Sequence, residues 1–160
     1  MTSLIVKDRN SMEDPRVAMS EKLKEAMKNK DTLTRDVIRM TMNAIKQVEI
    51  DTQKEVSAED AASIVMKEAK KRRDTIQELV ANGREDAAEA EKVELEIVER
   101  FLPKQLTREE IVDLVKKAIE ESGATSSKEM GKVMGILAPQ TKGKADGKLV
   151  NEVVRELLQG

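Results

Sequence analysis

The sequence predicts an all-α protein in which a four-helix, bundle-like module is joined at a proline to a three-helix tail module. Apolar residues recur at spacings of three and four along most of the chain, which is the period of an amphipathic helix. Charged residues make up 38% and hydrophobic residues 39%, a balance typical of helices with one solvated face. Only three prolines and seven glycines interrupt 160 residues, so strands and tight turns should be few.

The chain divides into an N-terminal arm over residues 1–14, an N-terminal module over 15–102 and a tail module over 103–160. The arm has no steady apolar period, so we expect it to be disordered or to form one small extra turn. Pro103 marks the joint between the modules because it lacks an amide proton and cannot continue a helix. Phe101, the one aromatic residue, is predicted to be an apolar plug that docks one module on the other.

The first two helices have clear start signals. Pro15 suits the first position of a helix that runs to about Asn29, and Asp14 precedes it as the cap. Asp31 caps the second helix, which should end near residues 51–54. The residues expected to face inward are Val17, Leu23, Ala26 and Met27 in the first helix and Leu33, Val37, Ile38, Thr41, Ala44, Ile45 and Val48 in the second.

The third and fourth helices should form an antiparallel hairpin. Residues 57–60 (SAED) begin the third helix in the manner of a capping box. Asn82 and Gly83 close it, because glycine accepts the left-handed backbone at a helix end. The fourth helix begins near Arg84 and stops at Pro103. The expected inward residues are Ala61, Ala62, Val65, Ala69, Ile76, Leu79 and Val80, then Ala87, Leu95, Val98 and Leu102.

The tail module reads as three shorter helices. Gly123 ends the fifth helix, Pro139 and a loop over residues 140–147 follow the sixth, and Asp146 caps the seventh. Two capping boxes begin the fifth and sixth helices, Thr107 with Glu110 and Ser126 with Glu129. The expected inward residues are Ile111, Leu114, Val115, Ala118, Ile119, Met130, Val133, Met134, Leu137, Leu149, Val150, Val153, Val154 and Leu157.

One charged side chain interrupts the apolar stripe of the third helix. Arg72 lies between Ala69 and Ile76, and in the hairpin register it falls within one turn of two glutamates. We therefore predict a partly buried ion pair between Arg72 and Glu91 or Glu94. Two interpretations are open at this point. The pair fixes the helix register, or Arg72 lines a binding groove.

Two basic segments are candidates for binding an anion. The run over residues 70–73 is diluted by Glu68 and Asp74, so we interpret it as a solvated helix face. The better candidate is a set of four lysines around a glycine-containing loop and the start of the last helix, namely Lys132, Lys142, Lys144 and Lys148. Ammonium groups and backbone amides at a helix start suit a phosphate. A flexible loop kept soluble by its charge is the alternative interpretation.

Composition excludes several kinds of chemistry. The chain has no cysteine and no histidine, which rules out disulfides, zinc sites of the usual kind and histidine-based acid–base catalysis. The net charge of −2 gives no global attraction for nucleic acid. No apolar run approaches the ~20 residues of a membrane span, so we expect a cytoplasmic protein. We also expect no metal, no cofactor and no catalysis by the chain alone.

Several motifs resemble those of the YqeY-like family. They lie at residues 37–40 (VIRM), 71–74 (KRRD), 83–86 (GRED), 101–106 (FLPKQL), 131–135 (GKVMG) and 142–151 (KGKADGKLVN). That family is similar to the C-terminal tail region of the B subunit of the glutamine-dependent aspartyl/glutamyl-tRNA amidotransferase. The resemblance implies a helical bundle followed by a three-helix tail and contact with tRNA. It also implies carbon–nitrogen ligase activity with glutamine as amido donor.

Three functional hypotheses follow. The first is a non-catalytic, tRNA-binding accessory module that holds backbone phosphates with the four lysines. The second, the alternative to it, is a protein-interaction adaptor for an aminoacyl-tRNA synthetase or an amidotransferase. An exposed apolar patch between the modules would favour this hypothesis. The third is an autonomous glutamine-dependent ligase, which would need to form an amide from glutamine and ATP without another subunit.

Overall fold

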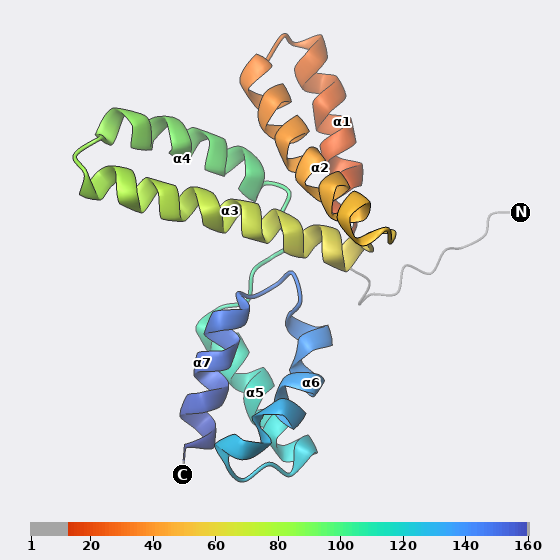
Figure 1. Ribbon diagram of the computed structural model, residues 1–160, viewed down its shortest axis with the longest axis vertical. Helices are drawn as coiled ribbons and strands as arrows, with labels where there is room; N and C mark the ends of the chain where they lie inside the picture. The colour runs from red at the N-terminus through yellow and green to blue at the C-terminus, as the bar shows by residue number, and fades with distance from the viewer. Residues whose placement is uncertain (1–12, 160) are drawn as a thin grey trace, which may run out of the picture.

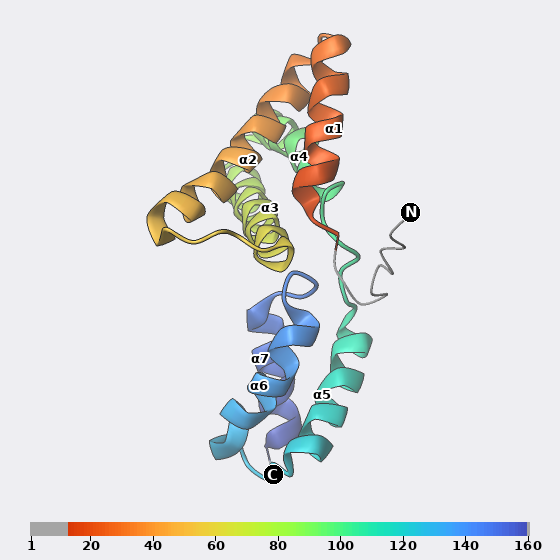
Figure 2. The ribbon, with the colours of Figure 1, turned by 90° about the vertical axis from the view of Figure 1, so that its right-hand side faces the viewer.

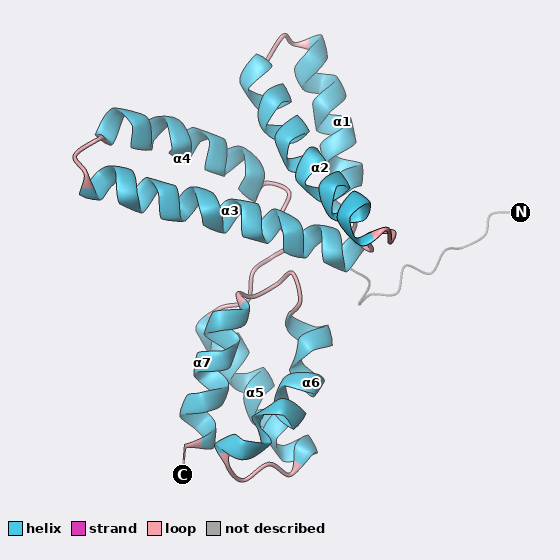
Figure 3. Cartoon of the chain, in the orientation of Figure 1, coloured by secondary structure: helices cyan, strands magenta, loops and turns pink. Residues whose placement is uncertain are grey.

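The computed structural model describes residues 13–159, and every regular element within that range is a helix (Figure 1, Figure 3). The all-α fold class is thereby confirmed. The helices are α1 (Pro15–Lys28), α2 (Thr32–Thr52), α3 (Ala58–Ala81), α4 (Glu85–Glu99), α5 (Arg108–Ser122), the 3-10 helix η1 (Ser127–Glu129), α6 (Met130–Thr141) and α7 (Gly147–Leu158). Most of the predicted N-terminal arm, residues 1–12, lies outside the described residues.

Helices α1 to α4 form two hairpins that cross. Helix α1 pairs with α2 and α3 with α4, and the two pairs run across each other in both perpendicular views (Figure 1, Figure 2). Helix α2 contacts both α3 and α4, so it joins the hairpins. A hydrophobic cluster lies at this crossing, built from Met19, Val37, Ile38, Ile45, Val56, Ala61, Val65, Ala69, Ile97 and Val98.

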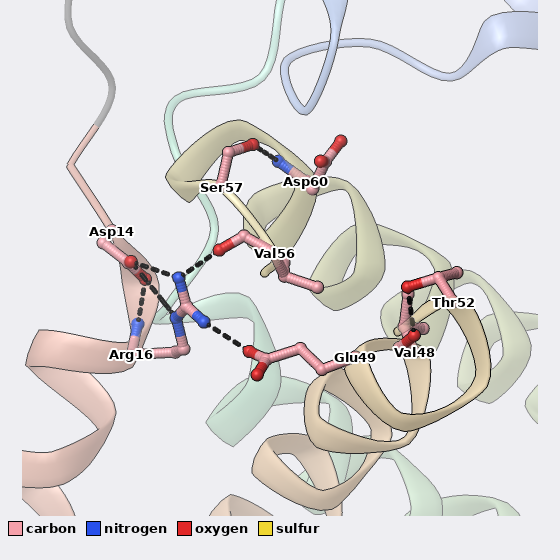
Figure 4. Close-up of polar contacts among 8 residues, drawn as sticks. All are labelled: Asp14, Arg16, Val48, Glu49, Thr52, Val56, Ser57 and Asp60. Carbon is pink, nitrogen blue, oxygen red and sulfur yellow. Dashed lines mark hydrogen bonds and ion pairs between the residues drawn. The ribbon is translucent and has the colours of Figure 1, made fainter. Parts of the chain in front are cut away.

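Arg16 ties the start of α1 to two other helices. Asp14 caps α1 as predicted, because its carboxylate accepts a hydrogen bond from the Arg16 amide at 3.0 Å. The Arg16 guanidinium donates to Asp14 at 2.7 Å, to Glu49 of α2 at 2.9 Å and to the Val56 carbonyl at 2.7 Å (Figure 4). Val56 directly precedes Ser57, whose hydroxyl caps α3 as predicted. One side chain therefore holds three helix termini together.

The tail helices enclose a second hydrophobic cluster. It consists of Ile111, Val115, Ala118, Ala124, Val133, Leu137, Ala145, Val150, Val153, Val154 and Leu158, all within the tail module. The capping box of Thr107 and Glu110 forms with both reciprocal hydrogen bonds. Gly123 ends α5 in the left-handed conformation at φ 68°, and the Asp146 carboxylate accepts from the Lys148 amide at 3.0 Å. These three predicted features are confirmed.

Some residues predicted to face inward are exposed. Val17 and Met27 are 63% and 52% exposed, whereas Met19, which the pattern did not single out, is fully buried. Met19 and Ala26 are seven residues apart and mark the buried face of α1. Val17 and Met27 fall outside that face, so the predicted stripe was wrong there.

Leu33, Val80 and Leu157 are also exposed, although they were predicted to face inward. Each lies within two residues of a helix terminus, where fewer neighbouring elements can cover a side chain. Further residues that the pattern had not singled out are buried, among them Ala88, Ile97 and Leu158.

Two helices end elsewhere than predicted, in both cases near a proline. Helix α4 ends at Glu99 rather than at Pro103, and the amides of residues 101 and 102 donate to carbonyls three residues back. Such tight turns are expected here because the residue before a proline avoids helical backbone. Helix α6, by contrast, continues through Pro139 to Thr141. A proline removes one backbone hydrogen bond of a helix, and at Pro139 that loss did not end α6.

The capping box predicted for Ser126 and Glu129 does not form. Ser126 makes no side-chain cap bond, and the Glu129 carboxylate accepts from the Thr125 amide at 2.7 Å instead. The physical reason is the 3-10 turn η1, which places Glu129 at the cap of α6 and not three residues inside a helix. The prediction treated these residues as part of a continuous helix.

Candidate functional site

Arg72 lies between the two helices of the α3–α4 hairpin. Its Nη1 donates to Glu94 at 2.5 Å and to Glu91 at 3.3 Å, and its side chain is only 11% exposed. The Nε atom of Arg72 is buried without a hydrogen-bond partner among the described residues. The arginine does not line the groove described below. That the pair serves to fix the helix register stays a prediction.

The loop between α6 and α7 is held against the joint. The Leu106 amide donates to the Lys144 carbonyl at 2.8 Å, and the Gln105 side-chain amide donates to the Gly143 carbonyl at 3.0 Å. Gln105 also donates to the Pro103 carbonyl at 2.9 Å, which orients its side chain. Gly143 is buried and has a φ of 77°, a conformation that favours glycine. The residues after the proline therefore position the lysine-bearing loop.

Two ion pairs connect this loop with α3 of the N-terminal module. The Lys142 ammonium contacts the Asp60 carboxylate, and the Lys70 ammonium lies 3.3 Å from the Asp146 carboxylate. The hydrogen bond from Lys142 holds the pKa of Asp60 below its ordinary value, against the opposing effect of burial. All four side chains are partly exposed, so each pair is weak alone and can exchange partners.

A groove of about 450 Å³ lies between the modules at these contacts. We call it the inter-module groove. One wall is a face of α3 and the other is formed by α6, the following loop and the start of α7. Its lining consists of Ser63, Met66, Lys67, Lys70, Arg73, Gln105, Met134, Ala138, Thr141, Lys142, Gly143, Ala145, Asp146, Gly147 and Val150.

The structure brings together only part of the predicted lysine set. Lys142 and Lys144 lie in the loop and Lys148 in the first turn of α7. Lys132 lies in the first turn of α6, and the rise of a helix places it about 15 Å along the axis from that loop. Its predicted position near the loop was therefore wrong. Between residues 13 and 159, neither Lys132, Lys144 nor Lys148 has an ion-pair partner, whereas Lys142 is paired with Asp60.

The N-terminus of α7 is not free to bind a phosphate. The Asp146 carboxylate already accepts the Lys148 amide and brings a negative charge to the helix N-terminus. A phosphate would be repelled by that carboxylate. Lysine side chains rather than α7 amides are thus the groups available to an anion, which corrects the predicted role of the helix start.

Residues 67, 70 and 73 of α3 are site residues that the sequence interpretation missed. Lys70 and Arg73 were assigned to a solvated face, yet both line the inter-module groove together with Lys67. Arg73 also pairs with Glu99 at 3.1 Å. Their spacing of three places them on one helix face, and that signal was present in the sequence. The missing information was that this face of α3 meets the tail loop.

Phe101 packs against the cluster of the N-terminal module, together with Leu102. It is absent from the residues packed on the tail cluster. The prediction that Phe101 docks one module on the other was therefore wrong. Backbone and side-chain hydrogen bonds of residues 103–106, with the two ion pairs, make that connection instead.

Two further properties concern only the part of the chain that the structure describes. Residues 13–159 hold no group of three or more acidic side chains arranged to bind a metal ion. None of the helices in the same range has the length and apolar character needed to cross a membrane.

Comparison with known proteins identifies the family. Altered inheritance of mitochondria protein 41, mitochondrial, of Candida glabrata is 38% identical over 105 residues, which cover 64% of this chain and 57% of that protein. The proteins of the same name from Kluyveromyces lactis and Lachancea thermotolerans are 36% and 35% identical over 85 residues, 52% of this chain and 46% of each protein. The chain thus spans about half the length of these curated relatives. The family described as Yqey-like protein matches residues 16–158, and the chain therefore belongs to the YqeY-like family.

Proposed function

We propose that this chain is a non-catalytic accessory module that binds the backbone phosphates of tRNA. Lys144 and Lys148 make the principal contacts. One observation carries the proposal. Residues 130–148 contain four lysines and one carboxylate, and that carboxylate, Asp146, is already occupied by Lys70 and by the cap of α7. Lys144 and Lys148 are left without a partner among residues 13–159 and close together in the chain.

The proposed contacts are electrostatic and independent of base sequence. An ammonium group binds phosphate oxygens as a point charge, so the contacts fix position and carry no sequence information. Lys142 contributes less, because Asp60 neutralises it in the structure. Lys132, at the far end of α6, can reach only a different phosphate. We expect binding with a strong salt dependence and little preference among tRNAs.

The choice of tRNA rests on the resemblance to the amidotransferase tail, and the lysine arrangement is compatible with any RNA backbone. Under this proposal the chain works beside an amidotransferase or a synthetase rather than as a ligase. The cytoplasmic location expected from the sequence is part of the same proposal. The curated relatives carry the word mitochondrial in their names.

The test is tRNA binding by the purified chain at about 50 and 200 mM salt. With two to three phosphate contacts, this increase should weaken binding about 10- to 40-fold. The variant Lys144→Ala/Lys148→Ala should bind more weakly at low salt, and its slope of log affinity against log salt should be smaller by about two. Glutamine- and ATP-dependent amide formation should be absent from the same preparation.

The matched control is Lys116→Ala/Lys117→Ala, which removes two exposed lysines from α5. It changes the net charge equally, so it should weaken binding far less if the contacts are local. Wild-type protein that fails to bind tRNA at low salt would refute the proposal. Equal losses in the two double variants would show that only overall charge matters.

A further inference from the structure

The α3 wall of the inter-module groove has the length of a short docked helix. It extends from Ser63 to Arg73, which corresponds to about 15 Å at the rise of an α-helix. A helix that anchors side chains at positions i, i+3 or i+4, and i+7 spans about 10 Å along its axis. The groove can therefore accept one face of a helix of two to three turns.

The apolar part of the groove lining, which we call its floor, is adaptable. Met66 of α3 and Met134 of α6 face it from opposite walls, with Val150 of α7 and Ala138 beside them. Methionine side chains are flexible and polarisable, and they suit surfaces that receive apolar side chains of a partner. This floor is the apolar surface between the modules that favours a protein partner.

A nucleic acid fits this floor poorly. Recognition of unpaired bases relies on aromatic rings or arginine planes on which the bases stack. The chain has one aromatic residue, Phe101, and it packs against the cluster of the N-terminal module outside the groove. Arg73 at the rim is held by Glu99. The groove and the proposed phosphate contacts at Lys144 and Lys148 are thus chemically different surfaces.

The charged part of the groove lining, which we call its rim, is mostly basic. Lys67, Lys70, Arg73 and Lys142 line it, against a single acidic residue, Asp146. Lys67 is exposed and has no ion-pair partner within residues 13–159. The other three hold partly exposed pairs with carboxylates, which a partner's carboxylates can replace at little cost. Charge complementarity therefore calls for an acidic partner.

We propose that the inter-module groove binds an amphipathic helix of a protein partner, with apolar residues at helical spacing and Asp or Glu along the edges of that face. Met66 and Met134 contact the apolar residues of that helix. Lys67 pairs with an Asp or Glu at the edge of its apolar face. This interaction goes beyond the proposed RNA binding and uses other residues.

The experiment is a selection of random peptides displayed on phage against the immobilised, nuclease-treated full chain. We expect enrichment of sequences with apolar residues at i, i+3 or i+4 and i+7 and an excess of Asp and Glu. Synthetic versions of the enriched peptides should become helical on binding. Their affinity should fall about tenfold or more in Met66→Glu and in Lys67→Glu.

Two variants serve as matched controls. Lys71→Glu makes the same charge change on α3 outside the groove, and Met40→Glu makes the same methionine change on an exposed face of α2. Both should leave peptide affinity within about twofold of wild type. Circular dichroism melting of each variant checks that it is folded. Lys67 is on the surface, so Lys67→Glu keeps the test informative even if Met66→Glu unfolds the chain.

Three outcomes would overturn this inference. No enrichment would do so, as would enriched peptides that bind Met66→Glu and Lys67→Glu as tightly as wild type. The third is tRNA binding that depends on Met66 and Lys67 and competes with the peptides, which would make RNA the occupant. Because tRNA binding is measured separately with the Lys144→Ala/Lys148→Ala variant, either proposal can fail without the other.

Discussion

The guanidinium of Arg72 on α3 lies 2.5 Å from the carboxylate of Glu94 on α4, and the carboxylate of Glu91 lies on the same side at 3.3 Å. The residues come from the two arms of one hairpin, which reverses at Gly83 with a φ of 71°. A shift of either helix along the other would separate the charges. We therefore predict that the pair discriminates between possible registers of these two helices, which are otherwise rich in alanine and glutamate.

Replacing Arg72 with methionine should lower the free energy of unfolding by about 2 kcal/mol. Removal of one partner from a buried pair costs about 3–5 kcal/mol, and the value here should be smaller because both glutamates are partly exposed. Urea denaturation followed by circular dichroism measures the change. Lys71→Met, on the exposed face of α3, should stay within about 0.5 kcal/mol of wild type. An unchanged midpoint for Arg72→Met would show that the pair contributes nothing.

Asp14→Asn should destabilise the chain at neutral pH and not at low pH. The hydrogen bond from the Arg16 side chain lowers the pKa of Asp14 below its ordinary value of 3.8. A lowered folded-state pKa gives stability that is present above the unfolded-state value and is lost as pH falls through the folded-state pKa. Because asparagine also caps helices well, the substitution removes the charge and keeps the cap.

We expect a difference of about 1–2 kcal/mol between wild type and Asp14→Asn at pH 7, as for a hydrogen bond to a charged group. Unfolding in urea at a series of pH values from 7 to below 3.8 measures it. Asp36→Asn is the control, because Asp36 is exposed and, within residues 13–159, pairs only with its neighbour Arg35. A difference for Asp14→Asn that persists unchanged at the lowest pH would contradict the assigned cause.

Gly143→Ala and Gly135→Ala should change stability in opposite directions. Gly143 has a φ of 77°, where an alanine side chain is strained by about 1–2 kcal/mol. Gly135 lies within α6, and a Cβ atom there would meet nothing within 4 Å. Alanine at that position should stabilise the chain by up to about 1 kcal/mol. Thermal or urea unfolding checks both, and a neutral Gly143→Ala would mean that the loop tolerates another conformation.

Leu137→Ala and Ile38→Ala should act on different parts of the molecule. Leu137 is buried in the tail cluster and Ile38 in the cluster of α1 to α4. Each substitution should cost about 2–5 kcal/mol locally. Hydrogen exchange should accelerate mainly in α5 to α7 for Leu137→Ala and mainly in α1 to α4 for Ile38→Ala. Equal acceleration throughout the chain in both variants would show that the two clusters unfold as one unit.

Local signals in the sequence predicted much of the fold, because helix starts depend on neighbouring residues. Asp14, Asp31, Ser57 and Thr107 all cap the helices assigned to them. Positions decided by tertiary packing were less predictable. The exposure of Val17 depends on which face of α1 meets α2, and the local pattern of a short helix defines that face poorly.

The candidate site was only half predictable for the same reason. The lysines around the α6–α7 loop stand close together in the sequence, so the pattern drew attention to them. Lys67 and Met66 belong to α3 and gain their role from a loop that lies far along the chain. The ion pair between Lys142 and Asp60 joins the α6–α7 loop to α3. No periodicity within either segment predicts that contact.

The hydrogen bond between the Leu106 amide and the Lys144 carbonyl also bears on the order of folding. Both hairpins of the N-terminal module pair helices that are consecutive in the chain, so their contacts form with little loop-closure entropy. Closing the loop onto residues 103–106 and α3 requires much more distant encounters. We therefore expect rapid formation of the hairpins and a later docking step. During synthesis on the ribosome, α1 to α4 can assemble before the segment that completes the groove has emerged.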